Sequence, residues 1–168
     1  MRRPSNFLII IAFILGNILV ANAQQNYTIT DFNKLIENNS TQTRSQQNFD
    51  SEEIEKLQNL VFELNPMLIF KGNEHKKMGE GDAQLVIIES SNLSQLHSIS
   101  NEMQSVVLIL IKHSSINNPS MLDLNSIKSS SLKYVLIECD FECSAANLQN
   151  ILKNTSNVKV LYRITSEQ

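Results

Sequence analysis

The sequence predicts an α/β fold: a short repeat of βα units around a roughly four-stranded parallel sheet, preceded by a helical N-terminal extension. Short apolar runs rich in β-branched residues recur along the second half of the 168-residue chain. Segments with apolar residues three or four positions apart lie between these runs. Strands that alternate with short helices are typical of parallel βα units.

The first 23 residues have the features of a secretory signal peptide. Arg2 and Arg3 form a positive start, an apolar run follows from Phe7 to Val20, and Ala21-Asn22-Ala23 supplies a cleavage pattern. The run is shorter than the about 20 apolar residues of a spanning helix and is interrupted by Gly16. We therefore expect an exported protein, periplasmic or secreted, with no membrane span after cleavage.

Charge limits the classes of partner. Loss of Arg2 and Arg3 with the signal peptide leaves 17 acidic residues against the remainder of the 14 basic ones, a net charge of about −5. This balance disfavours nucleic acid and anionic membrane surfaces as main partners. Two cysteines are too few for a disulfide scaffold, so the core must come from apolar burial.

Residues 24–51 are polar and are expected to form an N-terminal segment and linker ahead of a single α/β domain at 52–168. Within the segment, Thr30 is placed to cap a short helix, and 39–48 has the composition of a flexible linker. A firmer helix is expected from Glu52 to Leu64, since Asp50 and Glu53 have capping-box spacing. Pro66 ends it.

The remaining chain divides into apolar runs and connections. The runs expected as strands are Met67–Phe70, at an edge, and Gln84–Ser90, Val106–His113, Leu132–Cys139 and Val158–Ile164. A polar loop is expected at 71–82, and helices are expected at 92–103, 120–127 and 144–154.

These runs repeat at a regular interval. Val86, Ile109, Val135 and Val160 are separated by 23, 26 and 25 residues, within the 20–29 residue range of leucine-rich repeats. Leu132, Val135, Ile137 and Asp140 fall on the pattern L-x-x-L-x-L-x-x-N. The region from Ala83 to Ile164 thus resembles leucine-rich-repeat proteins. The resemblance implies strands in chain order and a concave sheet face that binds another protein.

Side chains alternate between the two faces of a strand, so one face collects a second apolar set. Its candidate interaction residues are Ile87, Leu110, Tyr134, Leu136 and Leu161. An exposed apolar patch of this size is typical of an interface. The alternative is that the helix at 52–64 covers it, which gives a three-layer domain and suits near-continuous apolar strands.

The same face carries a row of charges near the strand ends. Glu89, Lys112, Glu138 and Arg163 alternate in sign across the four expected strands. Opposite charges on adjacent strands stabilise a sheet by about 0.2–1 kcal/mol per pair. The alternation therefore favours the sequential strand order.

Cys139 and Cys143 are spaced as C-x3-C, unlike the C-x2-C of thioredoxin-like centres. A small structural disulfide or two partly buried thiols are both compatible with this spacing. The acidic neighbours Glu138, Asp140 and Glu142 disfavour a reactive thiolate. A thiol–disulfide role remains a minor alternative.

No recognised metal or cofactor pattern is found. Glu74, His75, Glu80 and Asp82 lie in the polar loop without a known ligand spacing. Gly79-Glu80-Gly81 lacks the rest of a phosphate-binding fingerprint. We expect no metal and no cofactor.

The sequence favours a non-catalytic interaction module that binds another protein through the second sheet face or the strand ends. The rival hypothesis is a small extracytoplasmic enzyme, because ligands of open parallel sheets bind at the carboxyl ends of the strands. Its candidate residues are Glu89, His113, Glu138 and Asp140.

Overall fold

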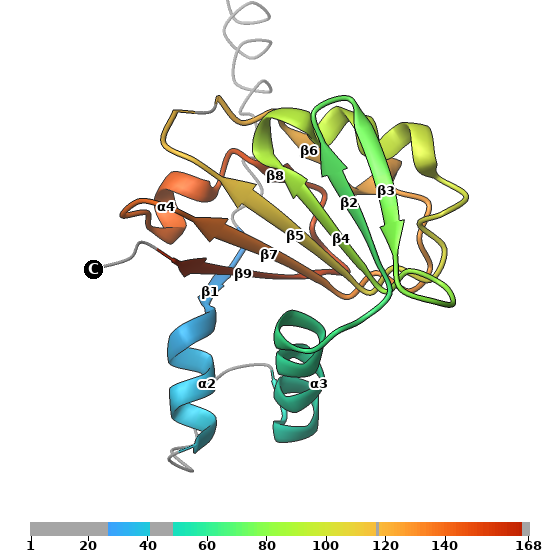
Figure 1. Ribbon diagram of the computed structural model, residues 1–168. Coiled ribbons are helices and arrows are strands. Elements are labelled where there is room, and N and C mark those ends of the chain that lie inside the picture. The colour runs from blue at the N-terminus through green and yellow to red at the C-terminus, as the bar shows by residue number, and fades with distance from the viewer. Residues whose placement is uncertain (1–26, 41–48, 117, 166–168) are drawn as a thin grey trace, which may run out of the picture.

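The computed structural model describes residues 27–40, 49–116 and 118–165 (Figure 1). The expected signal peptide and most of the expected linker lie outside these residues. The elements are β1 (Ile29–Asp31), α2 (Phe32–Ser40), α3 (Ser51–Phe62), β2 (Met67–Lys71), β3 (Glu74–Met78), β4 (Leu85–Glu89), η1 (Ser90–Ile99), β5 (Leu108–His113), β6 (Leu122–Asp123), η2 (Leu124–Ser126), β7 (Tyr134–Cys139), α4 (Ala145–Leu148), β8 (Leu152–Lys153) and β9 (Lys159–Ile164).

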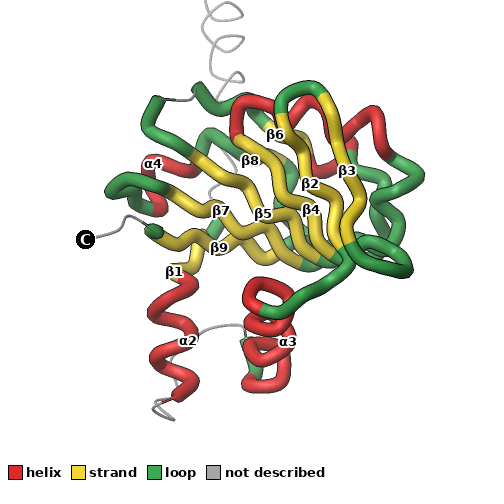
Figure 2. The backbone as a smooth tube through the Cα atoms, viewed as in Figure 1, coloured by secondary structure: helices red, strands yellow, loops and turns green. Residues whose placement is uncertain are grey.

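A seven-stranded, mostly parallel sheet organises the chain (Figure 2). Its strand order is β1-β9-β7-β5-β4-β2-β3, and β3 alone among these strands runs antiparallel to its neighbour. The α/β class predicted from the sequence is correct. The sheet is larger than the four strands expected, because β1, β2 and β3 extend it at both edges. Strands β6 and β8 pair with each other in a separate two-stranded sheet.

The first edge addition is a hairpin that the sequence analysis treats as a polar loop. Gly72, with φ of +60°, begins a two-residue turn, and β3 then folds back so that Lys71 faces Glu74. Glycine at the first central position suits this kind of hairpin turn. All five residues of β3 are exposed. Its Lys76 and Lys77 are the kind of residue that protects an edge strand from further pairing. Consequently β2 is not the edge strand that was expected.

The second edge addition comes from residues before the expected domain. Strand β1 pairs in parallel with β9, matching Ile29 to Val160, and leads directly into α2. Phe32 and Leu35 of α2 are buried against the sheet layer. Part of the polar N-terminal segment expected at 24–51 therefore belongs to the folded α/β unit.

The connections between the strands are less helical than expected. The chain after β4 forms the 3-10 helix η1, where Ser98 and Ser100 hydroxyls donate to backbone carbonyls three residues earlier. Such bonds compete with a regular helix. The expected helix at 144–154 is limited to α4, after which the chain enters β8. The expected helix at 120–127 is β6 followed by η2.

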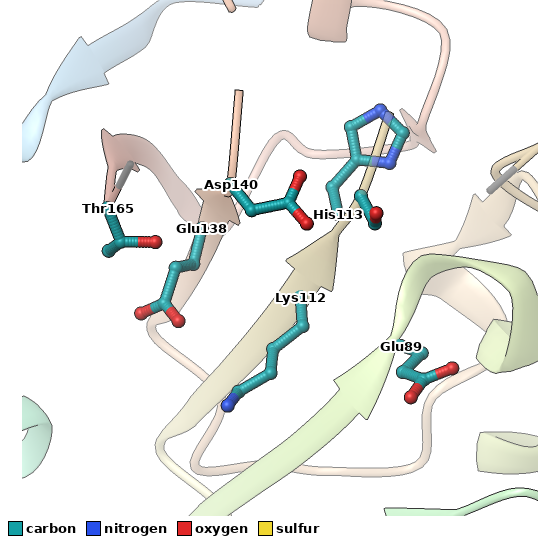
Figure 3. A pocket seen from close by; sticks show the side chains of 7 residues that line it. Glu89, Lys112, His113, Glu138, Asp140 and Thr165 are labelled. Carbon is teal, nitrogen blue, oxygen red and sulfur yellow. The ribbon is translucent and has the colours of Figure 1, made fainter. Parts of the chain in front are cut away.

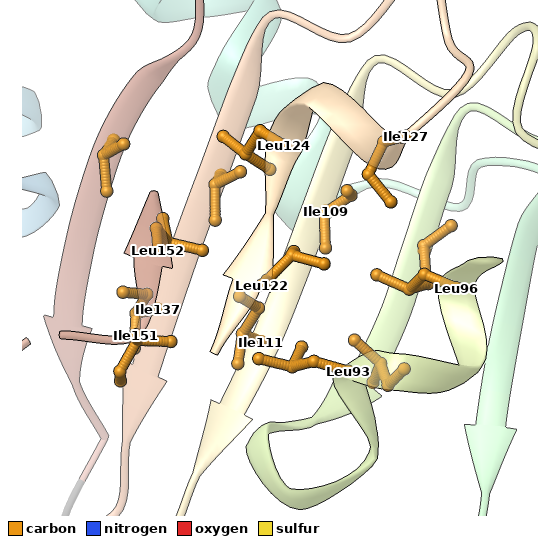
Figure 4. Packing of buried hydrophobic residues seen from close by; sticks show 14 of the residues in the cluster. Leu93, Leu96, Ile109, Ile111, Leu122, Leu124, Ile127, Ile137, Ile151 and Leu152 are labelled. Carbon is orange, nitrogen blue, oxygen red and sulfur yellow. The ribbon is translucent and has the colours of Figure 1, made fainter. Parts of the chain in front are cut away.

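Two cores lie on the two faces of the sheet. On the first face, residues of the strands pack against η1, β6, η2, α4 and β8 (Figure 4). Labelled members of this core are Leu93, Leu96, Ile109, Ile111, Leu122, Leu124, Ile127, Ile137, Ile151 and Leu152. On the second face, helices α2 and α3 pack on the sheet. No helix among the described residues has the length and apolarity to cross a membrane.

Helix α3 is fixed at both ends by local interactions. The Asp50 carboxylate accepts the backbone N–H of Glu53 at 2.8 Å and so caps the first turn. At the other end, the Asn65 side-chain amide donates to the carbonyl of Asn59 at 2.8 Å. Ile54, Leu57 and Leu60 recur at helical spacing and are buried toward the sheet.

Candidate functional site

A pocket of about 300 Å³ opens at the carboxyl ends of β4, β5, β7 and β9 (Figure 3). The parallel strands all end at this edge, so their last residues meet there. Its lining residues are Glu89, Lys112, His113, Ser114, Glu138, Asp140 and Thr165. The four candidate residues of the enzyme hypothesis, Glu89, His113, Glu138 and Asp140, are all among them.

The row of alternating charges crosses this pocket. Strand pairing sets Glu89 opposite Lys112, Lys112 opposite Glu138, and Glu138 opposite Arg163. Figure 3 shows the Lys112 side chain between those of Glu89 and Glu138. Neighbouring strands therefore present opposite charges at one height of the sheet.

The Glu138–Arg163 pair is the rigid part of this row. The Arg163 Nε donates to Glu138 Oε2 at 2.9 Å, and a second guanidinium nitrogen contacts the same oxygen. Both side chains are about 15 % exposed. The Arg163 guanidinium also lies 5.4 Å from the ring of Phe62 and 5.9 Å from that of Phe32, distances at which cations are attracted to aromatic faces. Arg163 thus links α2 and α3 to the pocket and fixes the Glu138 carboxylate.

Glu89 and Lys112 differ from that pair. Both are exposed, and neither side chain forms a hydrogen bond or ion pair with another described residue. They face each other across β4 and β5. The sheet edge therefore presents to solvent one carboxylate and one ammonium group that no other described side chain engages.

His113 lies at the same edge but is held by buried neighbours. Its Nδ1 lies 2.9 Å from the hydroxyl of Ser90, a fully buried residue that begins η1 directly after β4. The Phe141 ring packs edge-on to the imidazole at a centroid distance of 5.2 Å. Burial lowers the pKa of His113, and the nearby Asp140 carboxylate partly opposes this change. His113 is therefore a neutral imidazole at neutral pH.

A disulfide joins Cys139 to Cys143 directly beside His113. Cys139 is the last residue of β7 and faces His113 across the strands. The disulfide closes a loop that contains Asp140 and Phe141. The Asp140 carboxylate accepts the Ser115 N–H at 3.3 Å and points toward His113 (Figure 3). Asp140 of this loop therefore lines one wall of the pocket.

The candidate interaction face predicted from the sequence is largely covered. Leu110, Tyr134, Leu136 and Leu161 are all less than 5 % exposed and lie in the core formed with α2 and α3. Ile87 is half-buried against the same core. The covering helices, one of the two alternatives that the sequence leaves open, occupy the face that an open solenoid would present to a partner.

Tyr134 shows how this cover is fastened. Its hydroxyl donates to Glu53 Oε1 at 2.9 Å, and Lys159 Nζ contacts the other oxygen of the same carboxylate. Burial and the Glu53 carboxylate raise the pKa of Tyr134, so the hydroxyl stays protonated as a donor. This hydroxyl is engaged in packing α3 and is not available to a partner.

The acidic and histidine side chains of the expected loop at 71–82 do not gather. His75 Nε2 lies 3.1 Å from a Glu102 carboxylate oxygen, and the ring stacks on Phe70 at 5.3 Å. Glu74 is on the outer strand β3, whereas Glu80 and Asp82 follow it. Within the described part of the chain, no three His, Cys, Asp or Glu side chains are grouped as metal ligands.

Sequence reasoning missed several residues that contact His113 or line the pocket. Ser90 continues the face of Val86 and Ile88 by strand alternation, so its position beside His113 could have been derived from the pattern. Phe141 carries no such pattern, because it lies in a loop whose direction depends on the disulfide. Thr165 follows β9 and bonds through its hydroxyl to the carbonyl of Cys139 at 3.2 Å.

Neither a protein-family model nor a curated protein nor a solved structure matches this chain in the three comparisons with known proteins. The function proposed below therefore rests on the arrangement of this chain's own side chains.

Proposed function

We propose that this protein is an exported, non-catalytic interaction module that binds another protein at the carboxyl ends of its parallel strands. The observation that carries the proposal is the pair Glu89 and Lys112, exposed side by side and without a partner among the described residues. Beside them Glu138 is held in place by Arg163. A fixed pattern of opposite charges selects a partner with the complementary pattern and aligns it.

An apolar surface adjoins these charges on the same face of the sheet. Ile69 and Ile87 are paired across β2 and β4 and are both half-buried, although Ile87 packs in part against the core formed with α2 and α3. Ile87 and Glu89 are two residues apart on β4 and therefore share a face. A small apolar area with a charged border is the usual composition of a protein–protein interface.

We further infer that the βα units are of leucine-rich-repeat-like type. In support, β4, β5, β7 and β9 are adjacent in chain order and all parallel. The unit differs from an open solenoid in that α2 and α3 cover most of the second face. This difference moves the contact surface from the face to the strand ends.

The experiment uses a photo-crosslinking amino acid at position 165, which lines the pocket, in the protein expressed in its own host. We expect an adduct with a discrete partner, and we expect Glu89→Lys combined with Lys112→Glu to abolish it. This swap keeps the net charge but reverses the pattern, so a loss of the adduct reports recognition of the pattern. The same amino acid at the exposed Lys128 is the control position. Equal adducts at 165 and 128, or adducts unaffected by the swap, would contradict the proposal.

A second candidate function is acid–base catalysis by His113. The favouring observation is the 2.9 Å contact between the buried Ser90 hydroxyl and Nδ1, which orients a neutral imidazole at the pocket. A neutral imidazole beside a carboxylate can accept a proton from a bound substrate. Chromogenic ester, phosphoester and glycoside substrates test this function. An activity that is lost in His113→Gln and kept in His97→Gln would favour catalysis over simple binding.

A further inference from the structure

The loop closed by the disulfide makes most of the contacts that surround His113. The Asp140 N–H donates to the His113 carbonyl at 3.3 Å, and the Asp140 carboxylate accepts the Ser115 N–H. The Phe141 ring packs on the imidazole. Both residues lie between Cys139 and Cys143. The shape of this wall of the pocket therefore depends on a short covalently closed loop.

The two cysteine residues differ slightly in exposure. Cys139 is fully buried, whereas Cys143 is 8 % exposed at the start of the chain leading to α4. A disulfide of this kind constrains the chain between its ends by removing conformations that the open loop could adopt. Without it, the few noncovalent contacts of Asp140 and Phe141 must hold the loop against its conformational entropy.

We propose that the Cys139–Cys143 disulfide is a redox control of the pocket: its reduction by a dithiol releases Phe141 and Asp140 from His113 and opens that wall. The inference concerns the regulation of the site and rests on the proposed function of the pocket. Oxidised protein holds the arrangement that the structure shows, and reduced protein loses it.

The exchange is balanced with a dithiol as the reductant. A thiolate of the dithiol attacks Sγ of Cys143, the more exposed of the two residues. The attack forms a mixed disulfide and displaces Cys139 as a thiolate, which takes up a proton. The second thiol of the dithiol then attacks the mixed disulfide and releases Cys143. Two electrons and two protons pass to the protein, and the dithiol leaves as its own disulfide.

The His113 ring reports the state of the loop without any partner. Burial is the main cause of its lowered pKa, so release of Phe141 is expected to move the pKa upward, toward about 6.5. The other ionisable side chains lining the pocket are Glu89 and Lys112 at the ends of β4 and β5, and Glu138 and Asp140 at the end of β7. The upward direction holds because desolvation outweighs the opposing Asp140 charge.

The test is an NMR titration of the histidine rings in oxidised protein and in protein treated with dithiothreitol, a small dithiol. We expect the reductant to raise the His113 pKa and to shift resonances near 113–116 and 139–145, while His97 serves as an internal reference. Cys139→Ser combined with Cys143→Ser should reproduce the shift without reductant and should not respond to it. An unchanged His113 titration after complete reduction, or a disulfide that native protein protects from dithiothreitol, would overturn the inference.

A second variant keeps the test decisive if the serine variant does not fold. Phe141→Ala leaves the disulfide in place and should raise the His113 pKa in the oxidised protein, since it removes the covering ring directly. Failure of this variant to move the titration would also overturn the inference.

Crosslinking at position 165 separates this inference from the proposed function. Fewer partner adducts in reduced than in oxidised protein would support redox control of binding. Equal adducts in both states, together with a shifted His113, would contradict that control and leave the proposed function intact. Absence of adducts in both states would contradict the proposed function, and the His113 titration would still decide whether the loop opens.

Discussion

At the scale of single residues, the polar groups of this protein divide into those that fasten the fold and those that stay available. Glu53 binds both Tyr134 and Lys159, and Glu138 binds Arg163, so these carboxylates connect the helices or strands around them. Glu89 and Lys112 have the same chemistry and remain unpaired within the described chain. The four charges of this row lie at one height of the sheet, so position along the strand does not set their availability. Arg163 engages Glu138, whereas no described side chain engages Glu89 or Lys112.

The hydroxyl of Tyr134 gives a direct test of the fastening role. Tyr134→Phe removes its hydrogen bond to Glu53 in a buried setting, and we expect a loss of about 1–2 kcal/mol in the free energy of unfolding measured with urea. Tyr162→Phe is the matched control, because the Tyr162 hydroxyl lies 3.5 Å from Asp31 in a more exposed position. Equal effects of the two substitutions would argue against a special role for the Tyr134–Glu53 contact.

At the scale of elements, the helical layer decides what the sheet can do. Helix α3 buries Leu57 completely against the second face, and α2 adds Phe32 and Leu35. The core formed with these helices includes residues of β4, β5, β7 and β9, whereas Ile69 on β2 and Ile87 on β4 are only half-buried. The uncovered strip and the strand ends are therefore the parts of this face that remain open.

Two leucines of the same segment test how strongly α3 is held. Leu57→Ala creates a cavity under the helix and is expected to lower the free energy of unfolding by about 2–5 kcal/mol. Leu64→Ala makes the same chemical change at a side chain that is 99 % exposed, so its effect should stay within about 0.5 kcal/mol. Urea unfolding of both variants measures the difference. A small effect at Leu57 would mean that α3 does not pack on the sheet as the structure has it.

At the scale of the whole molecule, stability is concentrated in the middle of the sheet. Strands β5 and β7 are flanked on both sides by parallel neighbours and covered on both faces, and most of their side chains are buried. The edge strands β1 and β3 have one neighbour each, and β3 is wholly exposed. The centre should therefore open only with the global transition, whereas the edges can open locally.

Hydrogen exchange followed by mass spectrometry tests this gradient. We expect the slowest exchange in peptides that contain 108–113 and 134–139, intermediate rates in 85–89 and 159–164, and the fastest rates among the strands in 74–78. The physical reason is that central amides are exposed only when strands on both sides separate. Protection of β3 equal to that of β5 would show that its outer edge is paired in solution.

The hairpin of β2 and β3 shows where prediction from the sequence was incomplete. Its strand Glu74–Met78 has little apolar content, so the periodicity used to find strands gives it no weight. The pair Gly72-Asn73 was the available sign of a tight turn between two strands. The covered second face, in contrast, was already one of two alternatives suggested by the continuous apolar character of 106–111.

The sequence by itself determined the α/β class, the positions of the main strands and the residues at their carboxyl ends, because alternation and apolar runs are local properties of the chain. Only the tertiary structure decided what covers the second face, how many strands join the sheet and which side chains surround His113. Those outcomes depend on contacts between distant segments, such as Tyr134 with Glu53 and Phe141 with His113. Contacts of this kind form when elements pack, and no local pattern specifies them.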